Sequence, residues 1–173
     1  MSIEFFTKQW ATSDIDELVT VHNLGYMDEW DRKKFLEYSS MPQNHIESIW
    51  ALHRKKSSRL AGYMAWGETP YTLWLHHLVI DPHYRRMGFA HELMSNLKEY
   101  RLKLTGKPRI SISVTEDNDT AQLWLKRQGF ICTSIVQAEE CPTPQDCNWY
   151  VFEFDSVPNQ LLRKARRIGN AAV

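Results

Sequence analysis

The sequence has no long apolar run, no surplus of charge and only three cysteines. No stretch stays apolar over the roughly 20 residues that a membrane-spanning helix needs, and the N-terminal residues do not resemble a signal peptide. The formal net charge is +0 at pH 7, which argues against a nucleic-acid-binding surface that covers the chain. An odd number of cysteines is typical of a reducing compartment. We therefore expect a cytoplasmic protein that binds neither a membrane nor a nucleic acid.

The two cysteines nearest the C-terminus do not form a recognisable metal site. Cys141 and Cys147 flank a Pro-Thr-Pro loop, and their spacing fits none of the common metal-binding patterns. We interpret them as free thiols, with a fortuitous disulfide as the alternative. Near the C-terminus, four basic residues form a cluster: Arg163, Lys164, Arg166 and Arg167. Such a cluster is typical of a solvated helix or an oligomer contact, and RNA binding is the less favoured interpretation.

The length and composition predict one domain with enough apolar content for a core. We expect this α/β domain to cover residues 1–157 and a short basic tail to cover residues 158–173. Apolar periodicity predicts the element order β-α-α-β-β-β-α-β-α-β-β. The expected strands cover residues 3–8, 48–53, 60–66, 71–81, 109–114, 130–136 and 149–154. The expected helices begin at a Thr12-Ser13 cap, at Asp31, after Arg86 and at Asp117.

The segment from Asp81 to Ala90 has the residues of a polyphosphate-binding turn. It follows a nearly continuous apolar strand and precedes an amphipathic helix. The first N–H groups of a helix have no intrahelical partner and lie at the positive end of its dipole, so they attract phosphate. Gly88 permits close approach of the backbone, and Arg85 and Arg86 add charged contacts. The segment contains neither G-x-G-x-x-G nor a P-loop, and an ordinary solvated helix start is the alternative.

A second segment makes the first more informative. It runs from Thr115 to Ala121 and is followed by Gly129-Phe130. With both segments, the sequence resembles the GNAT superfamily of acetyl-CoA-dependent N-acyltransferases over residues 60–155. Val79-Ile80-Asp81-Pro82 with the residues up to Ala90 is similar to motif A, and Asn118-x-x-Ala121 with Gly129-Phe130 is similar to motif B.

The resemblance implies direct transfer of the acetyl group of acetyl-CoA to a primary amine, in a ternary complex and without a metal. It also implies the GNAT fold, a central mixed twisted sheet flanked by helices. The partners are then acetyl-CoA and an amine acceptor, and the family allows a homodimer. In the family, motif A binds the pantetheine arm and pyrophosphate, and motif B lines the other wall. The implied cofactor-binding residues are Leu78, Val79, Ile80, Arg85, Arg86, Met87, Gly88, Phe89, Ala90, Asn118 and Leu125.

The candidate general base lies on the strand before motif A. Side chains alternate along a strand, so Trp74 and His76 are expected on one face and His77 on the other. In the family, residues corresponding to positions 74 and 76 face the amine, and many members have a glutamate at one of them. An unperturbed imidazole titrates at about 6.5, which suits proton removal from an ammonium and makes His76 the candidate. A buried neutral histidine bonded to backbone is the alternative for His76, and His77 is expected to have a structural role.

The sequence departs from the family at Leu125, where a tyrosine usually protonates the departing sulfur. Leucine cannot donate a proton. The thiolate of a thiol with a pKa of about 8.5 is nevertheless an adequate leaving group without a dedicated acid. Tyr150 is a conceivable substitute. The departure also motivates an alternative function, an acyl-CoA-binding regulatory module with little or no catalysis.

Two segments correspond to the regions where the family binds its amine, Tyr26 to Trp30 and Glu139 to Trp149. The first resembles the ribosomal-protein N-terminal alanine acetyltransferases, although Asp28 replaces a proline of that subgroup and Ser113 replaces a glutamate. The acidic residues of both segments favour a cationic acceptor, but an ordinary solvated surface explains them equally well.

Overall fold

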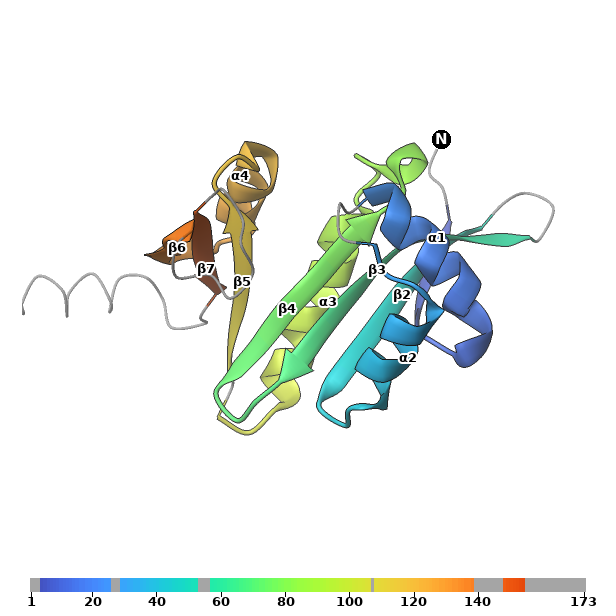
Figure 1. The fold of residues 1–173 in the computed structure, drawn as a ribbon, viewed down its shortest axis with the longest axis horizontal. Helices are drawn as coiled ribbons and strands as arrows, with labels where there is room; N and C mark the ends of the chain where they lie inside the picture. Colours follow the sequence, from blue (N-terminus) through green and yellow to red (C-terminus); the bar gives the residue numbers. More distant parts are fainter. Residues whose placement is uncertain (1–3, 26–28, 53–56, 107, 139–147, 155–173) are drawn as a thin grey trace, which may run out of the picture. The chain divides into compact units, whose positions relative to one another are not determined.

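The structure is a computed structural model, and it describes residues 4–25, 29–52, 57–106, 108–138 and 148–154. The chain divides into two compact units, Met1–Pro108 and Arg109–Val173. Figure 1 shows both units, with their helices and most of their strands labelled. The expected boundary between the domain and its basic tail, at residues 157 and 158, lies outside the described residues, as do Cys141 and Cys147.

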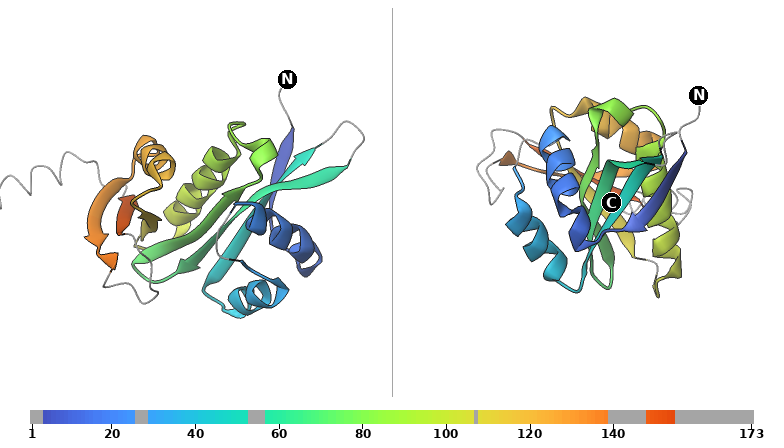
Figure 2. Two further views of the ribbon diagram at one scale, coloured as in Figure 1. Left: turned by 45° about the horizontal axis from the view of Figure 1, so that its top comes forward. Right: turned by 90° about the vertical axis from the view of Figure 1, so that its right-hand side faces the viewer.

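The first unit is a four-stranded antiparallel sheet in the order β1-β2-β3-β4. Its strands are β1 (Phe5–Gln9), β2 (Asn44–Leu52), β3 (Ser58–Glu68) and β4 (Thr72–Ile80). Its helices are α1 (Ile15–Gly25), α2 (Arg32–Ser40) and α3 (Phe89–Lys103), with single 3-10 turns η1 (Thr12–Asp14) and η2 (Pro82–Tyr84). In Figure 2, α1 and α2 lie on one face of this sheet and α3 lies on the other.

Apolar residues at helical spacing explain these layers. Ile15, Leu18 and Val21 of α1 and Phe35 of α2 belong to one buried cluster with residues of β2, β3 and β4. On the opposite face, α3 buries its own apolar residues, among them Leu93, Met94 and Leu97. Strand β3 is buried on both faces from Leu60 to Gly67, which explains its nearly unbroken apolar sequence.

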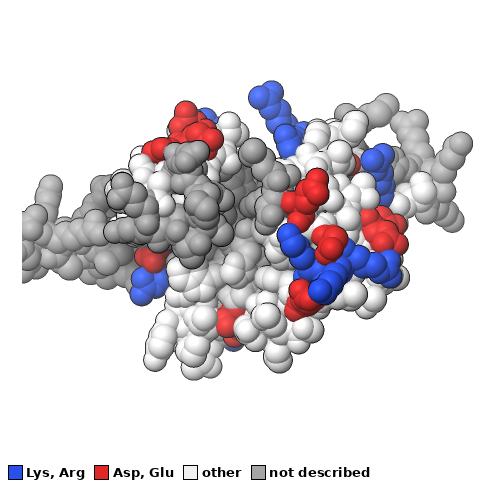
Figure 3. Space-filling view, viewed as in Figure 1, with Lys and Arg blue, Asp and Glu red and all other residues white. Residues whose placement is uncertain are grey.

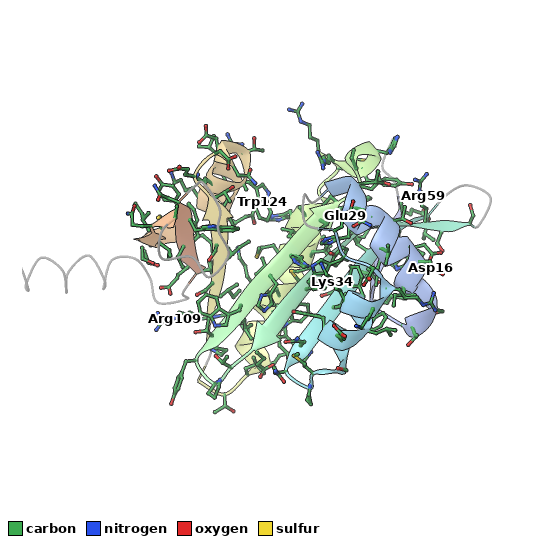
Figure 4. All side chains as sticks on the ribbon, viewed as in Figure 1. Asp16, Glu29, Lys34, Arg59, Arg109 and Trp124 are labelled. Atoms are coloured by element: carbon green, nitrogen blue, oxygen red, sulfur yellow. The ribbon has the colours of Figure 1, made fainter. Side chains whose placement is uncertain are left out.

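The second unit is a smaller antiparallel sheet with one helix. Its strands are β5 (Arg109–Thr115), β6 (Ile131–Val136) and β7 (Trp149–Phe154), in the order β5-β7-β6, and its helix is α4 (Asp119–Arg127). Leu125, Phe130 and Phe152 are buried in it. On its exposed side, Arg109 pairs with Glu153 at 3.1 Å (Figure 4).

The predicted α/β class and all eleven predicted helices and strands are confirmed, in the predicted order. Asp31 caps α2 as expected, because its carboxylate accepts from the Lys34 N–H at 2.8 Å. The Thr12-Ser13 cap was wrong: these residues form η1, and the carboxylate of Asp14 accepts from the Ala11 N–H instead. Strand β2 begins at Asn44, earlier than predicted, because residues 44–47 pair with β3.

The surface of the first unit mixes charges of both signs. On the face shown in Figure 3, acidic and basic side chains lie next to one another over α1 and α2, and they include the pair Arg32–Asp16 at 2.7 Å. In the described part of the chain, no helix has the length and apolar content to cross a bilayer. The same residues contain no group of three or more His, Cys, Asp or Glu placed to hold a metal ion.

Candidate active site

Strand β4 ends in a turn that the buried carboxylate of Asp81 holds together. The Asp81 N–H donates to the Ala61 carbonyl at 2.9 Å, which ties the turn to β3. The carboxylate of Asp81 accepts a hydrogen bond from the His83 N–H and contacts His83 Nδ1, each at 2.9 Å. Burial alone would raise the pKa of Asp81, but these bonds, with the charges of His83 and Arg59, hold that pKa below its usual value. Asp81 is therefore a charged cap for η2, a role that sequence analysis missed although Asp-Pro is a common turn start.

The chain then passes through two left-handed residues into α3. Arg86 has φ 63° and Gly88 has φ 90°, and Gly88 is the N-cap of the helix. The helix predicted after Arg86 begins at Phe89, because residues with positive φ cannot continue a right-handed helix. Successive N–H groups in such a turn form a concave anion-binding surface, and the first N–H groups of α3 have no intrahelical acceptor.

The space in front of this turn suits a bulky anion. A Cβ added at Gly88 would meet no atom within 4 Å, and Arg85, Arg86, Met87 and Gly88 are all exposed. Phe89 is only 2% exposed, so only its backbone could contact a ligand there. Arg85 is directed by its Nε, which donates to the Ile80 carbonyl at 3.3 Å. The structure thus brings the predicted residues 85–90 together around one open, N–H-rich corner, and cofactor binding by them stays a prediction.

Residues 78–80 lie directly before this turn in β4. Val79 is buried against α1, where a Cβ on Gly25 would lie 2.7 Å from its Cγ1. Leu78 and Ile80 are half-buried. Val79 can therefore offer a ligand only its backbone, which is what the predicted role of this segment requires.

An irregularity in β4 changes the direction of His76. Ala65 of β3 is opposite His77, whereas Trp66 is opposite Leu75, so His76 is an extra residue in the ladder. Such a bulge re-aims side chains. His76 contacts the ring of Tyr38 in α2, with centroids 5.7 Å apart, and His77 contacts Trp30, which precedes α2, at 4.4 Å. The expectation that the two histidines face opposite sides of the sheet was wrong, because the bulge interrupts the alternation on which it depended.

The surroundings of His76 suit a proton acceptor. Part of the ring is exposed, while the strand and α2 remove water from the rest, and this burial lowers the pKa of His76. A lowered pKa keeps the imidazole neutral at neutral pH, the form that accepts a proton. Trp74, in the same strand, is 41% exposed. The role of His76 as general base stays a prediction that this geometry permits.

His77 lies in a buried aromatic cluster. Its ring is close to those of His22, at 5.1 Å, and Trp30, and His22 Nδ1 is hydrogen-bonded to the Tyr63 hydroxyl. Two hydrogen bonds, one from each neighbouring helix, hold the residues just before α2. The Trp30 N–H donates to Asn23 Oδ1 at 3.2 Å, and Lys34 Nζ donates to the Glu29 carbonyl at 2.7 Å (Figure 4). These contacts agree with the structural role expected of His77.

The residues predicted from motif B lie in the second unit. Asn118 is the N-cap of α4, and its side chain accepts from the Ala121 N–H at 3.1 Å. Leu125 is 1% exposed, so its side chain packs within the protein. Tyr150 is half-buried in β7, opposite Val114 and Ile135. The cofactor contacts of Asn118 and Leu125, and the role of Tyr150, stay predictions. Asp28 and the acidic residues 139–140 lie outside the described residues.

Replacing Asp81 with asparagine is expected to lower the free energy of unfolding by about 2 kcal/mol at neutral pH, because charged hydrogen bonds are lost. The folded-state pKa is below the unfolded value, so this stabilisation is present above the unfolded pKa of about 3.8 and disappears as the pH falls through the folded value. Urea unfolding at neutral pH and in acid should therefore show a difference between wild type and variant that shrinks in acid. The exposed Asp16→Asn is the control, and a difference independent of pH would contradict the assignment.

Comparison with known proteins gives one family. The chain matches the family described as "Acetyltransferase (GNAT) family" over residues 15–130. No curated protein is similar enough in sequence to count as a relative. The matched range includes α1 to α4 and the corner at residues 85–90.

Solved structures with the same fold are numerous. The ribosomal-protein-S18-alanine N-acetyltransferase of Escherichia coli is 15% identical, with a TM-score of 0.72 over 87% of this chain and 93% of that chain. NAA60 of Arabidopsis thaliana in complex with a bisubstrate analogue is 15% identical, with a TM-score of 0.74 over 87% and 98%. Naa50 of Arabidopsis thaliana in complex with the bisubstrate analogue CoA-Ac-MVNAL is 14% identical, with a TM-score of 0.70 over 90% and 99%. At these sequence identities, the similarity to the solved structures shows a shared fold only.

Proposed function

The chain belongs to the acetyltransferase (GNAT) family, and from that premise we propose that it acetylates a primary amine of a peptide or protein, with small amines as the alternative acceptors. The observation that supports this most directly is the left-handed turn at Arg86 and Gly88, which opens the start of α3 to an anionic ligand. Acetyl-CoA supplies an activated acyl group and a diphosphate, and the N–H groups of residues 87–91 would bind the diphosphate.

The protein's own residues have two tasks in this reaction. Backbone N–H groups and the arginines at residues 85 and 86 hold the donor, and His76 takes a proton from the attacking amine, directly or through water. A bond forms between the amine nitrogen and the carbonyl carbon, the carbon–sulfur bond breaks, and the sulfur leaves as thiolate. The proton that restores the thiol comes from solvent or from His76, since Leu125 has none to give.

A peptide or protein acceptor is proposed from the fold neighbours. One acetylates the alanine of ribosomal protein S18, and another is bound to an analogue that joins CoA to a peptide. Their sequences are too distant to transfer a substrate. The shared fold covers most of this chain, so peptide and protein amines are the first acceptors to test.

Four further properties of the protein are proposals as well. A cytoplasmic location is supported by the odd number of cysteines, and the absence of nucleic-acid or membrane partners by the zero net charge. A single domain ending at residue 157 and a homodimer are compatible with the family.

The proposed function is tested by turnover on a panel of amines. Purified protein is incubated with acetyl-CoA and with peptides of varied N-terminal residue, free polyamines and aminoglycosides, and thiol release and product mass are measured. We expect saturable acetylation of at least one peptide amine. Tight binding of acetyl-CoA without turnover on any amine would instead favour the regulatory module.

A further inference from the structure

Strand β1 forms the open edge of the sheet in the first unit. In the described part of the chain its only strand neighbour is β2, and the two pair without a shift of register (Figure 2). The Glu4 carbonyl and the Trp10 N–H bond to the backbone of β2, at 2.8 and 3.2 Å. Because the hydrogen-bonding groups alternate along an antiparallel strand, those of Phe5, Thr7 and Gln9 point away from β2. They face the open edge.

Two phenylalanines of β1 are exposed, one on each face of the sheet. Phe5 is 41% exposed and packs edge-on against Phe89 of α3, with ring centroids 5.4 Å apart. Phe6 is 37% exposed and stacks on Trp50 of β2, with centroids 6.3 Å apart. Unpaired backbone groups beside exposed aromatic rings are a template for pairing with another strand. The edge is therefore suited to be covered by one.

The charges of β1 are complementary to those of a second copy of the same strand. When two copies run antiparallel with Phe6 opposite Phe6, Glu4 of each copy lies opposite Lys8 of the other. These three residues then form the non-hydrogen-bonded pairs, in which opposed side chains are closest. Phe5 lies opposite Thr7, and both have their backbone groups on the open edge, so the ladder of hydrogen bonds is completed in the same register.

The side chain of Lys8 can take part in such a pair. It is 39% exposed, and its Nζ lies 3.0 Å from the Asp14 carboxylate and 4.5 Å from the centroid of the Trp50 ring. An ammonium has three N–H groups, and a carboxylate has two oxygens to accept them. A second carboxylate, that of Glu4 from the other copy, can therefore share the same ammonium.

We propose that β1 pairs antiparallel with β1 of a second copy of this chain, in the register that puts Phe6 opposite Phe6. The two sheets then become one continuous sheet across a two-fold axis, and the exposed aromatic rings of both copies are covered. Glu4 and Lys8 would repel a strand with an unsuitable charge pattern and so select the chain's own copy. The interface does not depend on the proposed acetyl transfer.

Charge reversal tests this register. Glu4→Lys places two lysines opposite each other in each of the two symmetric pairs, and Lys8→Glu places two glutamates there. Each variant should raise the dissociation constant of the dimer about tenfold, because two attractive cross-strand pairs become repulsive. In an equimolar mixture every pair is again Lys opposite Glu, so a heterodimer should form as tightly as the wild-type dimer.

Sedimentation velocity over a range of concentrations gives the dissociation constants, and native mass spectrometry with one variant 15N-labelled identifies the heterodimer. The control is Lys33→Glu, because Lys33 is exposed on α2 and pairs with Glu37 at 3.6 Å. This variant should dimerise like the wild type.

Lys8→Glu also removes the contact with Asp14, so a second measurement leaves Lys8 unchanged. In the proposed register Phe6→Cys brings two cysteines directly opposite each other, with Cα atoms about 4.5 Å apart, where a disulfide can form. In Thr7→Cys the two cysteines are diagonal neighbours, about 7 Å or more apart, and should not link. Mild oxidation followed by peptide mass spectrometry measures both.

Three results would overturn the proposal. The wild type could sediment as a monomer at every concentration, or the mixture could stay as dissociated as its components. The third is a disulfide between positions 7 and none between positions 6. The amine panel would be unaffected by any of them, because acetyl transfer by one copy does not require β1 to be covered.

Discussion

Replacement of Gly88 by alanine is expected to weaken the binding of acetyl-CoA at least tenfold, the equivalent of one or two hydrogen bonds from backbone N–H groups. Gly88 has φ 90°, where a side chain costs about 1–2 kcal/mol. The turn can relieve this strain only by rotating the N–H groups away from the diphosphate, and if it stays, the methyl group occupies the open space before α3. Isothermal titration calorimetry with acetyl-CoA measures the effect.

Gly106 offers a matched control for this variant. It has φ 80°, a Cβ added there would also meet no atom within 4 Å, and it follows the other end of α3. Gly106→Ala should therefore lose a similar free energy of unfolding and keep the affinity for acetyl-CoA. Equal affinities in the two variants would show that the turn at residues 86–88 does not hold the cofactor.

Replacement of His76 by alanine should lower kcat/KM for the amine about 100-fold, the usual contribution of a general base, while the affinity for acetyl-CoA stays unchanged. Since burial lowers the pKa of His76, the wild-type profile of kcat/KM should rise through an acidic limb with an apparent pKa below about 6.5. This limb should be missing in the variant. Stopped assays over a range of pH give both quantities.

His45→Gln is the control for loss of an imidazole from the same sheet. His45 is partly exposed, stacks on Trp66 and pairs with Glu68. It should change neither the rate nor the acidic limb. A rate in His76→Ala equal to that of the wild type would assign proton removal to another group.

Local sequence predicted most of the fold. Each predicted strand and helix depended on apolar periodicity and on residues that start or end an element. The apolar run at residues 72–80 is an example of the first, and the Asp31 cap is an example of the second. The open corner at residues 85–90 was predictable for the same reason, since the two arginines and Gly88 lie within four residues of one another in the sequence.

The features that the sequence did not predict depend on distant partners. The bulge that turns His76 toward α2 arises from pairing with Ala65 and Trp66, and no local pattern signals it. Gly67 lies opposite Asn44, and only the folded sheet defines this register. The left-handed conformation of Arg86 is uncommon for a residue with a side chain, and apolar periodicity does not reveal it.

We propose that backbone N–H groups at the start of α3 bind the diphosphate of acetyl-CoA. A titration of 15N-labelled protein with coenzyme A, followed by amide chemical shifts, tests this binding residue by residue. We expect the largest changes at residues 87–91, next to the left-handed turn. Binding that leaves these amides unchanged while it shifts others would show that the diphosphate is held elsewhere.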